Sequence, residues 1–280
     1  MNRFRTYIPA SVAALSLLGC LVVAGCQKAQ SRPPAAVAAS NSFLECVAKD
    51  LLGSNTPVMR LADPGMCPGH FDIRPSEVEE LRHAKVLLRF DFQKSLDAKL
   101  GGSEGGVRIV EVRVAGGLCE PESYLSACKQ VSDVFVEMGL LTRALADHKL
   151  QWIGKRLDEL SQSSKQAIAS AGLGDQPVLA SIHQEAFCKW LGLRPVATFS
   201  GADSAGVGQV DQAIAQGRQA GVKLVIANLP EGRRVADALA ERLGAKVVVL
   251  GNFPALDKGQ SSFDDLLKSN VNALVEAAGK

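Results

Sequence analysis

The second half of the chain alternates short apolar runs with helical patterns, and this alternation limits the possible folds more than any other feature. The apolar runs have the length and the Val, Ile and Leu content of strands buried on both faces. These runs cover residues 177–181, 195–199, 222–227 and 245–250. The helical patterns cover residues 184–191, 207–219, 230–243 and 263–278. Strands separated by helices predict a parallel, doubly wound α/β sheet.

The residues that follow each apolar run are candidates for ligand binding. In doubly wound sheets the ligand binds outside the carboxyl ends of the strands. His183 follows the first run, residues 201–206 follow the second, Asn228 follows the third and Asn252 follows the fourth. We therefore expect ligand contacts from this set.

The first half of the chain predicts a second, less regular α/β lobe. Helices are expected over residues 41–52 and 77–84, and strands over 57–61, 85–90 and 107–114. Ser76 and Glu79 have the spacing of a capping box that opens the second of these helices. The loop 63–70 ends at His70, so this histidine also follows a predicted strand.

A long helical segment connects the two halves. Its main part places five apolar side chains on roughly one face, namely Leu145, Trp152, Ile153, Leu157 and Leu160. A helix of about 30 residues extends roughly 45 Å, enough to run along both lobes. The sequence thus predicts two doubly wound α/β lobes, over 41–140 and 173–280, with the ligand cleft between them. A single long helix over 141–172 joins the lobes.

The N-terminus has the features of an export signal. Arg3 and Arg5 precede a long uncharged apolar stretch, as in a secretory signal peptide. The stretch ends in Val23-Ala24-Gly25-Cys26, which resembles the lipobox at which bacterial lipoproteins are cleaved and diacylated. This predicts a signal peptide over 1–26, lipid attachment and membrane anchoring at Cys26, and a flexible tether over 27–40. The alternative is a transmembrane anchor, because the stretch approaches the ~20 residues that a span needs. Both interpretations place the body outside the cytoplasm.

The charge balance argues against nucleic-acid binding. The chain has 31 Lys and Arg residues against 29 Asp and Glu residues, and two of the basic residues lie in the predicted signal peptide. The remainder carries no net charge and contains no basic run. Binding to phosphates needs a concentrated basic surface, so nucleic acid is excluded as a partner.

Three segments carry a resemblance to a known family. Residues 68–81 contain His70 followed by Pro75-Ser76 at the start of a helix, and residues 182–193 contain His183 followed by Gly192-Leu193. These two segments, together with the C-terminal segment 262–274, resemble the zinc/manganese-binding solute-binding proteins of ABC transporters.

The resemblance implies a function and a set of site residues. It implies a periplasmic lipoprotein, not an enzyme, that binds a zinc-like metal ion and delivers it to an ABC permease. It also implies that His70 and His183 are metal ligands, the first and third of the family. The long helix would then limit hinge motion, and metal release would involve small shifts of the lobes.

Two of the family's ligand positions are altered in this chain. Gly116 stands where the family has its second histidine. The fourth ligand, usually a carboxylate of the C-terminal lobe, falls near Asn228 or Asn252, and neither residue is anionic. The alternative function is therefore a solute-binding fold that has lost its usual metal site and binds another solute or a protein partner.

Two cysteines lie where they could replace the missing ligands. Zinc needs about four ligands, and a site of Cys67, His70, Cys119 and His183 would supply them. Thiolates favour zinc, or copper(I), over manganese. Because thiols oxidise readily outside the cytoplasm, the alternative is a disulfide between Cys67 and Cys119, or pairing of either one with Cys46 or Cys128.

Overall fold

The computed structural model describes residues 35–63, 73–99, 106–204, 206–256 and 259–279. The predicted signal peptide with Cys26, and the loop residues Cys67 and His70, lie outside these ranges. Within the described residues, no helix has the length and hydropathy that a membrane span requires. All contacts reported below lie within the compact unit 34–280.

The N-terminal lobe contains a parallel sheet of four strands in the order β2-β1-β3-β4. The strands are β1 (Val37–Ala39), β2 (Val58–Arg60), β3 (Val86–Phe90) and β4 (Arg108–Val112). The helices of this lobe are α1 (Ser42–Leu52), α2 (Pro75–Leu81) and α3 (Ser95–Lys99), with the 3-10 helix η1 (Asp91–Gln93) after β3.

The C-terminal lobe contains a second parallel sheet, in the order β6-β5-β7-β8. Its strands are β5 (Pro177–Ser181), β6 (Arg194–Phe199), β7 (Leu224–Asn228) and β8 (Lys246–Leu250). Its helices are α6 (Glu185–Trp190), α7 (Val207–Ala220), the 3-10 helix η3 (Leu229–Glu231), α8 (Arg234–Leu243) and α9 (Phe263–Ala278). In both sheets the first strand lies between the second and the third, so the two sheets share one topology. The predicted fold class is confirmed.

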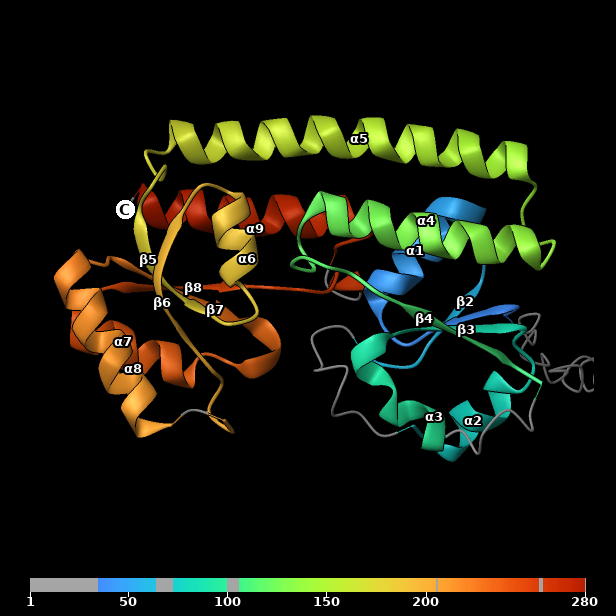
Figure 1. Cartoon of the computed structure of the whole chain (residues 1–280), viewed down its shortest axis with the longest axis horizontal. Helices are drawn as coiled ribbons and strands as arrows, with labels where there is room; N and C mark the ends of the chain where they lie inside the picture. The colour runs from blue at the N-terminus through green and yellow to red at the C-terminus, as the bar shows by residue number, and fades with distance from the viewer. Residues whose placement is uncertain (1–34, 64–72, 100–105, 205, 257–258, 280) are drawn as a thin grey trace, which may run out of the picture. The chain divides into compact units, whose positions relative to one another are not determined.

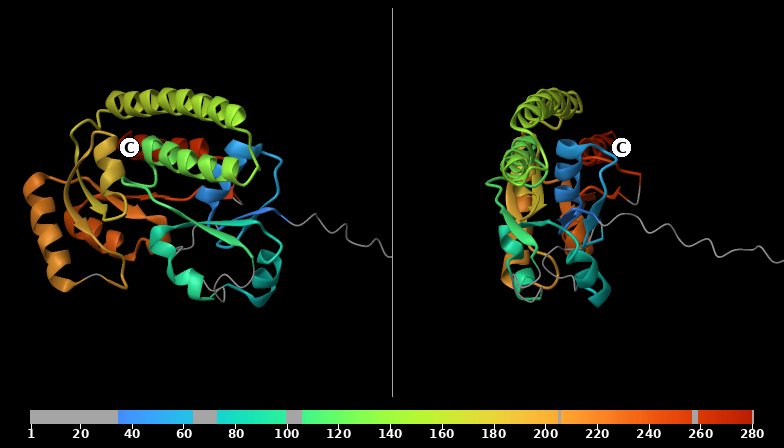
Figure 2. Two further views of the ribbon diagram at one scale, coloured as in Figure 1. Left: turned by 45° about the vertical axis from the view of Figure 1, so that its right-hand side comes forward. Right: turned by 90° about the vertical axis from the view of Figure 1, so that its right-hand side faces the viewer.

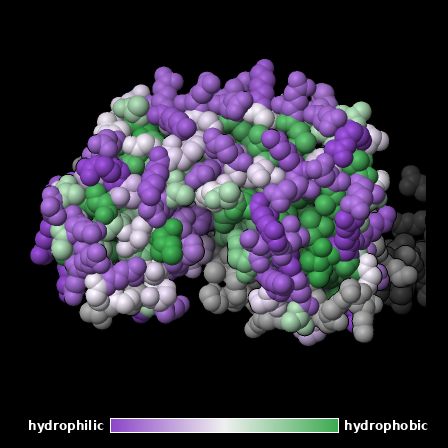
Figure 3. Space-filling model, in the orientation of Figure 1, coloured by the Kyte–Doolittle hydropathy of each residue, from purple (hydrophilic) through white to green (hydrophobic). Residues whose placement is uncertain are grey.

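Helix α4 (Pro121–Glu137) and the long helix α5 (Arg143–Ser170) connect the two sheets. Helix α5 packs against both α4 and α9 (Figures 1 and 2), and its visible outer surface is mostly hydrophilic (Figure 3). The single connecting helix is confirmed. Its buried stripe contains Ile153, Leu157 and Leu160, as predicted, but Leu145 and Trp152 are about half exposed. Each precedes a buried residue by one position, which turns it about 100° away from the packed face.

Three local predictions were wrong. Strand β1 lies within the stretch assigned to the tether, and its residues are buried between β2 and β3. Helix α2 begins at Pro75, where the backbone N–H of Arg74 donates to Glu77 Oε2 at 2.8 Å; Ser76 and Glu79 therefore form no capping box. The helix expected over 230–243 is divided at Gly232, whose φ of +72° ends η3 before α8 begins.

One hydrophobic core includes residues of both lobes. At its centre, Phe43 of α1 lies 5.1 Å from Tyr124 of α4 and 5.9 Å from Phe263 of α9 between ring centroids. Tyr124 and Phe263 stack at 4.2 Å. Because α9 follows the C-terminal sheet and α1 follows β1 of the N-terminal sheet, this aromatic cluster joins elements of both lobes.

Candidate functional site

A histidine and a carboxylate meet at the carboxyl edge of the C-terminal sheet. His183 follows β5, and Glu231 ends the 3-10 helix η3 that follows the neighbouring strand β7. The His183 Nε2 atom lies 3.7 Å from Glu231 Oε1. The histidine side chain is 56% exposed and the glutamate side chain 18% exposed, so the pair is open to a solute.

The Glu231 carboxylate is held in place by neighbouring elements. Its Oε2 atom accepts a hydrogen bond from the Ser181 hydroxyl at 2.5 Å, and its Oε1 atom accepts one from the backbone N–H of Gly201 at 3.0 Å. A Cβ atom at position 201 would lie 2.9 Å from the Glu231 Cβ, so glycine is required for this close approach. These contacts leave the carboxylate oriented beside His183.

Glu231 is a candidate site residue that sequence reasoning missed. The expected carboxylate position was Asn228 or Asn252, whereas Glu231 stands three residues beyond Asn228 on the same edge of the sheet. A search of the whole loop after β7, instead of its first residue, would have found it.

Beside this pair lies a cluster of neutral amides. Gln184, which follows His183, is fully buried. Its Nε2 atom donates to Asn252 Oδ1 at 2.8 Å, to Asn228 Oδ1 at 3.1 Å and to the carbonyl of Leu250 at 3.4 Å. Both asparagines are at least 95% buried. The two residues expected near the fourth ligand position therefore belong to an uncharged hydrogen-bond network.

Cys119 is buried next to the amide cluster, with its Sγ atom 3.5 Å from Asn252 Oδ1. Its Sγ donates to the carbonyl of Gly251 at 2.9 Å and accepts from Asn270 Nδ2 at 3.4 Å. Burial, with smaller contributions from Cys188 and Glu120, raises the pKa of the Cys119 thiol well above its usual range. The group is therefore a neutral thiol near pH 7, and metal binding would require its deprotonation.

The cysteine predictions are resolved only in part. Cys119 is a free thiol, as are the other described cysteines, Cys46, Cys128 and Cys188. The disulfide considered for Cys119 is therefore not formed in the structure. Whether Cys119 and Cys67 are metal ligands stays a prediction, as does the role of His70.

Among the described residues, His183 and Glu231 are the two candidate metal ligands that lie close together. No group of three or more His, Cys, Asp and Glu side chains in the described part of the chain is placed to hold a metal ion. Because zinc usually has four ligands, His183 and Glu231 would supply about half of a site.

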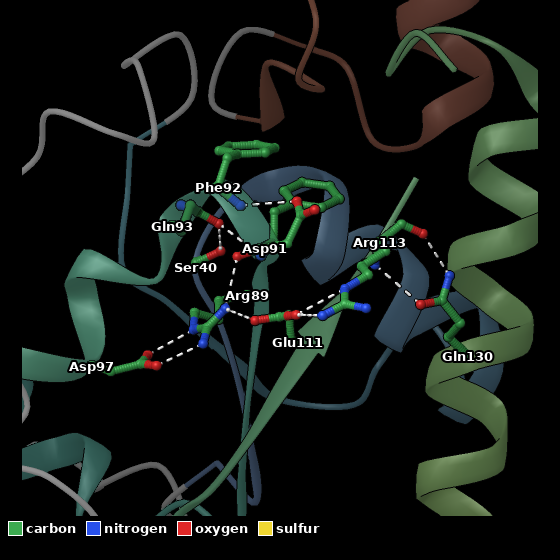
Figure 4. A network of polar contacts seen from close by, with 10 residues as sticks. Ser40, Arg89, Asp91, Phe92, Gln93, Asp97, Glu111, Arg113 and Gln130 are labelled. Atoms are coloured by element: carbon green, nitrogen blue, oxygen red, sulfur yellow. Dashed lines mark hydrogen bonds and ion pairs between the residues drawn. The ribbon is translucent and has the colours of Figure 1, made fainter. Parts of the chain in front are cut away.

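At the corresponding edge of the N-terminal sheet, uncharged groups link the ends of two strands. At the ends of β1 and β3, the hydroxyl of Ser40 donates to Gln93 Oε1 at 2.6 Å, and the backbone N–H of Phe90 donates to the same oxygen at 3.0 Å (Figure 4). Nearby, the buried Arg89 pairs with Asp97 and Glu111. The bonds of Gln93 therefore link the two strand ends.

Comparison with known proteins identifies the family. The family model described as zinc-uptake complex component A, periplasmic (ZnuA), matches residues 120–277. Among curated proteins, none matches the chain.

Solved structures share the fold. The manganese-bound and cadmium-bound periplasmic metal binding protein from Candidatus Liberibacter asiaticus each match with a TM-score of 0.74 and 12% identity. A crystal structure of ZnuA matches with a TM-score of 0.70 and 14% identity. All three matches cover 86% of this chain and 98% of the other. At this identity they establish the fold alone.

The family model covers more than half of the chain, including α4, α5 and the C-terminal lobe with His183 and Glu231. This confirms the predicted resemblance, and with it the expectation of a binding protein instead of an enzyme. The chain is therefore a member of the ZnuA family of periplasmic zinc-uptake components.

Proposed function

We propose that this protein is an extracytoplasmic solute-binding lipoprotein that captures a zinc-like metal ion and delivers it to an ABC permease. The observation that carries the proposal is the His183–Glu231 pair at the carboxyl edge of the C-terminal sheet. The family is described by zinc uptake, and the similar solved structures include manganese-bound and cadmium-bound proteins.

The spacing of the pair fits a shared metal ion. With zinc-ligand bonds of about 2.0–2.1 Å in a tetrahedral site, two ligand atoms stand roughly 3.3 Å apart. His183 Nε2 and Glu231 Oε1 are 3.7 Å apart, so a small rotation of the exposed imidazole suffices. We propose His70 and Cys67 as further ligands, and Cys119 as a ligand only if its thiol loses its proton. The imidazole ligands of this set favour zinc, and the thiolate of Cys67 would also admit copper(I).

The proposed route to the membrane rests on the N-terminal sequence. Residues 1–26 would direct export, and the lipid on Cys26 would hold the mature chain at the membrane surface, where the permease resides. The tether would end before β1, because Val37 already belongs to the sheet.

Zinc should stabilise the protein through His183 and Glu231. At 100 times the dissociation constant, a ligand adds about 2.7 kcal/mol to the free energy of unfolding. For a body of this size we expect the Tm to rise by roughly 5–10 °C. Thermal unfolding of chelator-stripped residues 27–280, under reducing conditions, should show this rise, and His183→Ala and Glu231→Gln should each remove most of it.

Matched variants separate the ligands from other residues. His148→Ala removes an exposed histidine of α5 and should leave the zinc-induced rise unchanged, whereas loss of the rise in Cys119→Ser would make Cys119 a ligand. The same scan with manganese, copper(I) and iron(II) identifies the preferred ion. No rise with any of the four ions would refute metal capture.

The amide cluster favours a second candidate function. Gln184, Asn228 and Asn252 carry no charge and hydrogen-bond to one another. A fold that has lost its metal site and binds another polar solute or a protein partner would have this character. It would show no metal-induced rise in Tm.

A further inference from the structure

The orientation of the amide cluster follows from one backbone carbonyl. The carbonyl of Leu250 is an acceptor only, so the Gln184 amide nitrogen must face it. The same nitrogen is 2.8 Å from Asn252 and 3.1 Å from Asn228, so both asparagines turn their oxygens inward.

Because Asn228 and Asn252 turn their side-chain oxygens toward Gln184, their NH2 groups point away from it. Among the described residues, neither Asn228 Nδ2 nor Asn252 Nδ2 has a hydrogen-bond partner. Both nitrogen atoms also keep some exposed surface, because neither is among the enclosed polar atoms without a partner. Gln184 Oε1, in contrast, is enclosed and has no donor. Buried polar groups are normally paired, so this network is incomplete in the protein alone.

These amide groups have the wrong chemistry for a bare cation. An NH2 group donates hydrogen bonds and binds carboxylate or carbonyl oxygens, and it cannot take the place of an anionic metal ligand. The proposed cation-binding pair, His183 and Glu231, comes from the same two strand ends, since Gln184 follows His183 and Asn228 lies three residues before Glu231. One edge of the sheet thus presents both a metal-binding pair and donors for oxygen.

We propose, on the basis of the proposed function, that the cargo is a metal ion already held by a small carboxylate-bearing chelator. His183 and Glu231 displace water from the open coordination positions of the metal. Asn228 Nδ2 and Asn252 Nδ2 donate to carboxylate oxygens of the chelator. The chelator supplies the ligands that the altered family positions do not.

Equilibrium dialysis tests whether the chelator is retained with the metal. The mature chain, stripped of metal, is dialysed against radiolabelled zinc alone, radiolabelled citrate alone, and both together. We expect zinc and citrate to be retained in equal amounts when both are present, and citrate to be lost when zinc is absent. Malate and histidine serve as further carboxylate chelators in parallel dialyses.

Two isosteric variants test the amide contacts. Asn252→Asp keeps the inward oxygen that accepts from Gln184 and replaces the outward NH2 by a negative oxygen, and Asn228→Asp does the same at its position. Each should weaken zinc-citrate binding at least tenfold. Asn272→Asp introduces the same chemical change at an exposed site of α9 and should leave binding unchanged. Urea unfolding verifies that each variant is folded.

Each contrary result has a separate meaning. Zinc retained equally well with and without citrate, malate or histidine, and with no chelator retained beside it, would overturn the chelate proposal and leave metal capture intact. Citrate retained without zinc would overturn it in favour of the second candidate function. If neither zinc nor any chelator is retained, whether added alone or together, both metal capture and the chelate proposal are refuted. Native affinity in both asparagine variants would overturn the assigned contacts.

Discussion

Replacing Phe43 with alanine should lower the free energy of unfolding by about 3–5 kcal/mol, the usual cost of removing a large aromatic side chain from a core. Phe43 has no exposed surface. Its ring contacts Phe90 at 5.4 Å and Tyr124 at 5.1 Å between centroids, and Phe263 lies slightly farther away. Urea unfolding at constant pH measures the loss as a lower midpoint.

Phe92→Ala is the matched control for this prediction. Phe92 also stacks on Phe90, at 5.1 Å, but its side chain is 54% exposed. An aromatic pair contributes about 0.5–1.5 kcal/mol beyond burial, so we expect a loss of about 1 kcal/mol. Equal losses in the two variants would show that the aromatic cluster is not the centre of the core.

The Phe43 cluster also bears on movement between the two lobes. It joins α1 and β3 to α4 and α9, so moving the lobes apart would expose aromatic surface. Burial of apolar surface contributes about 25 cal/mol per Å², which makes such opening costly. Release through small shifts of the lobes, which the family resemblance implies, stays a prediction.

Replacing Arg156 with methionine should cost about 3 kcal/mol of unfolding free energy. Arg156 of α5 donates to Asp50 Oδ2 at 2.6 Å, and its Nε atom lies 3.3 Å from Asp264 Oδ1. Tyr124 donates to the same Asp50 carboxylate. Removing one partner of a buried ion pair leaves uncompensated charge, at about 3–5 kcal/mol. The lower end applies because these side chains are about one-fifth exposed.

The loss in Arg156→Met should depend on pH. Burial raises the pKa of Asp264 above its usual range, and the nearby Arg156 opposes this. Without the arginine the folded-state pKa of Asp264 rises further. A carboxyl group with a raised folded-state pKa destabilises the fold as pH increases through that pKa. Urea unfolding should therefore show a smaller deficit at pH 5 than at pH 7.

Arg143→Met provides the comparison on the same helix. Arg143 pairs with Asp133 at 2.8 Å, but both side chains are more than half exposed. Exposed ion pairs contribute about 0–1 kcal/mol, so this variant should unfold close to the native midpoint at both pH values. A deficit in Arg156→Met that is no larger, or that grows toward acid pH, would contradict the assigned role of Arg156.

The elements that sequence reasoning located well have strong local patterns. Strand β5 and helix α9 were expected over 177–181 and 263–278, and their observed bounds are the same. Strand β1 was missed because the three residues Val37–Ala39 carry too little pattern. Its burial depends on β2 and β3, which come later in the chain.

The sequence by itself determined the alternation of strands and helices, the parallel sheets and the long connecting helix, because apolar periodicity is a local property. It also placed His183 at a strand end. Only the tertiary structure decided that Glu231 stands beside His183, because that contact depends on the pairing of β5 with β7 and on the missing side chain at Gly201. The neutral amide cluster was decided in the same way, since Gln184, Asn228 and Asn252 come from three separate strand ends that meet at one edge.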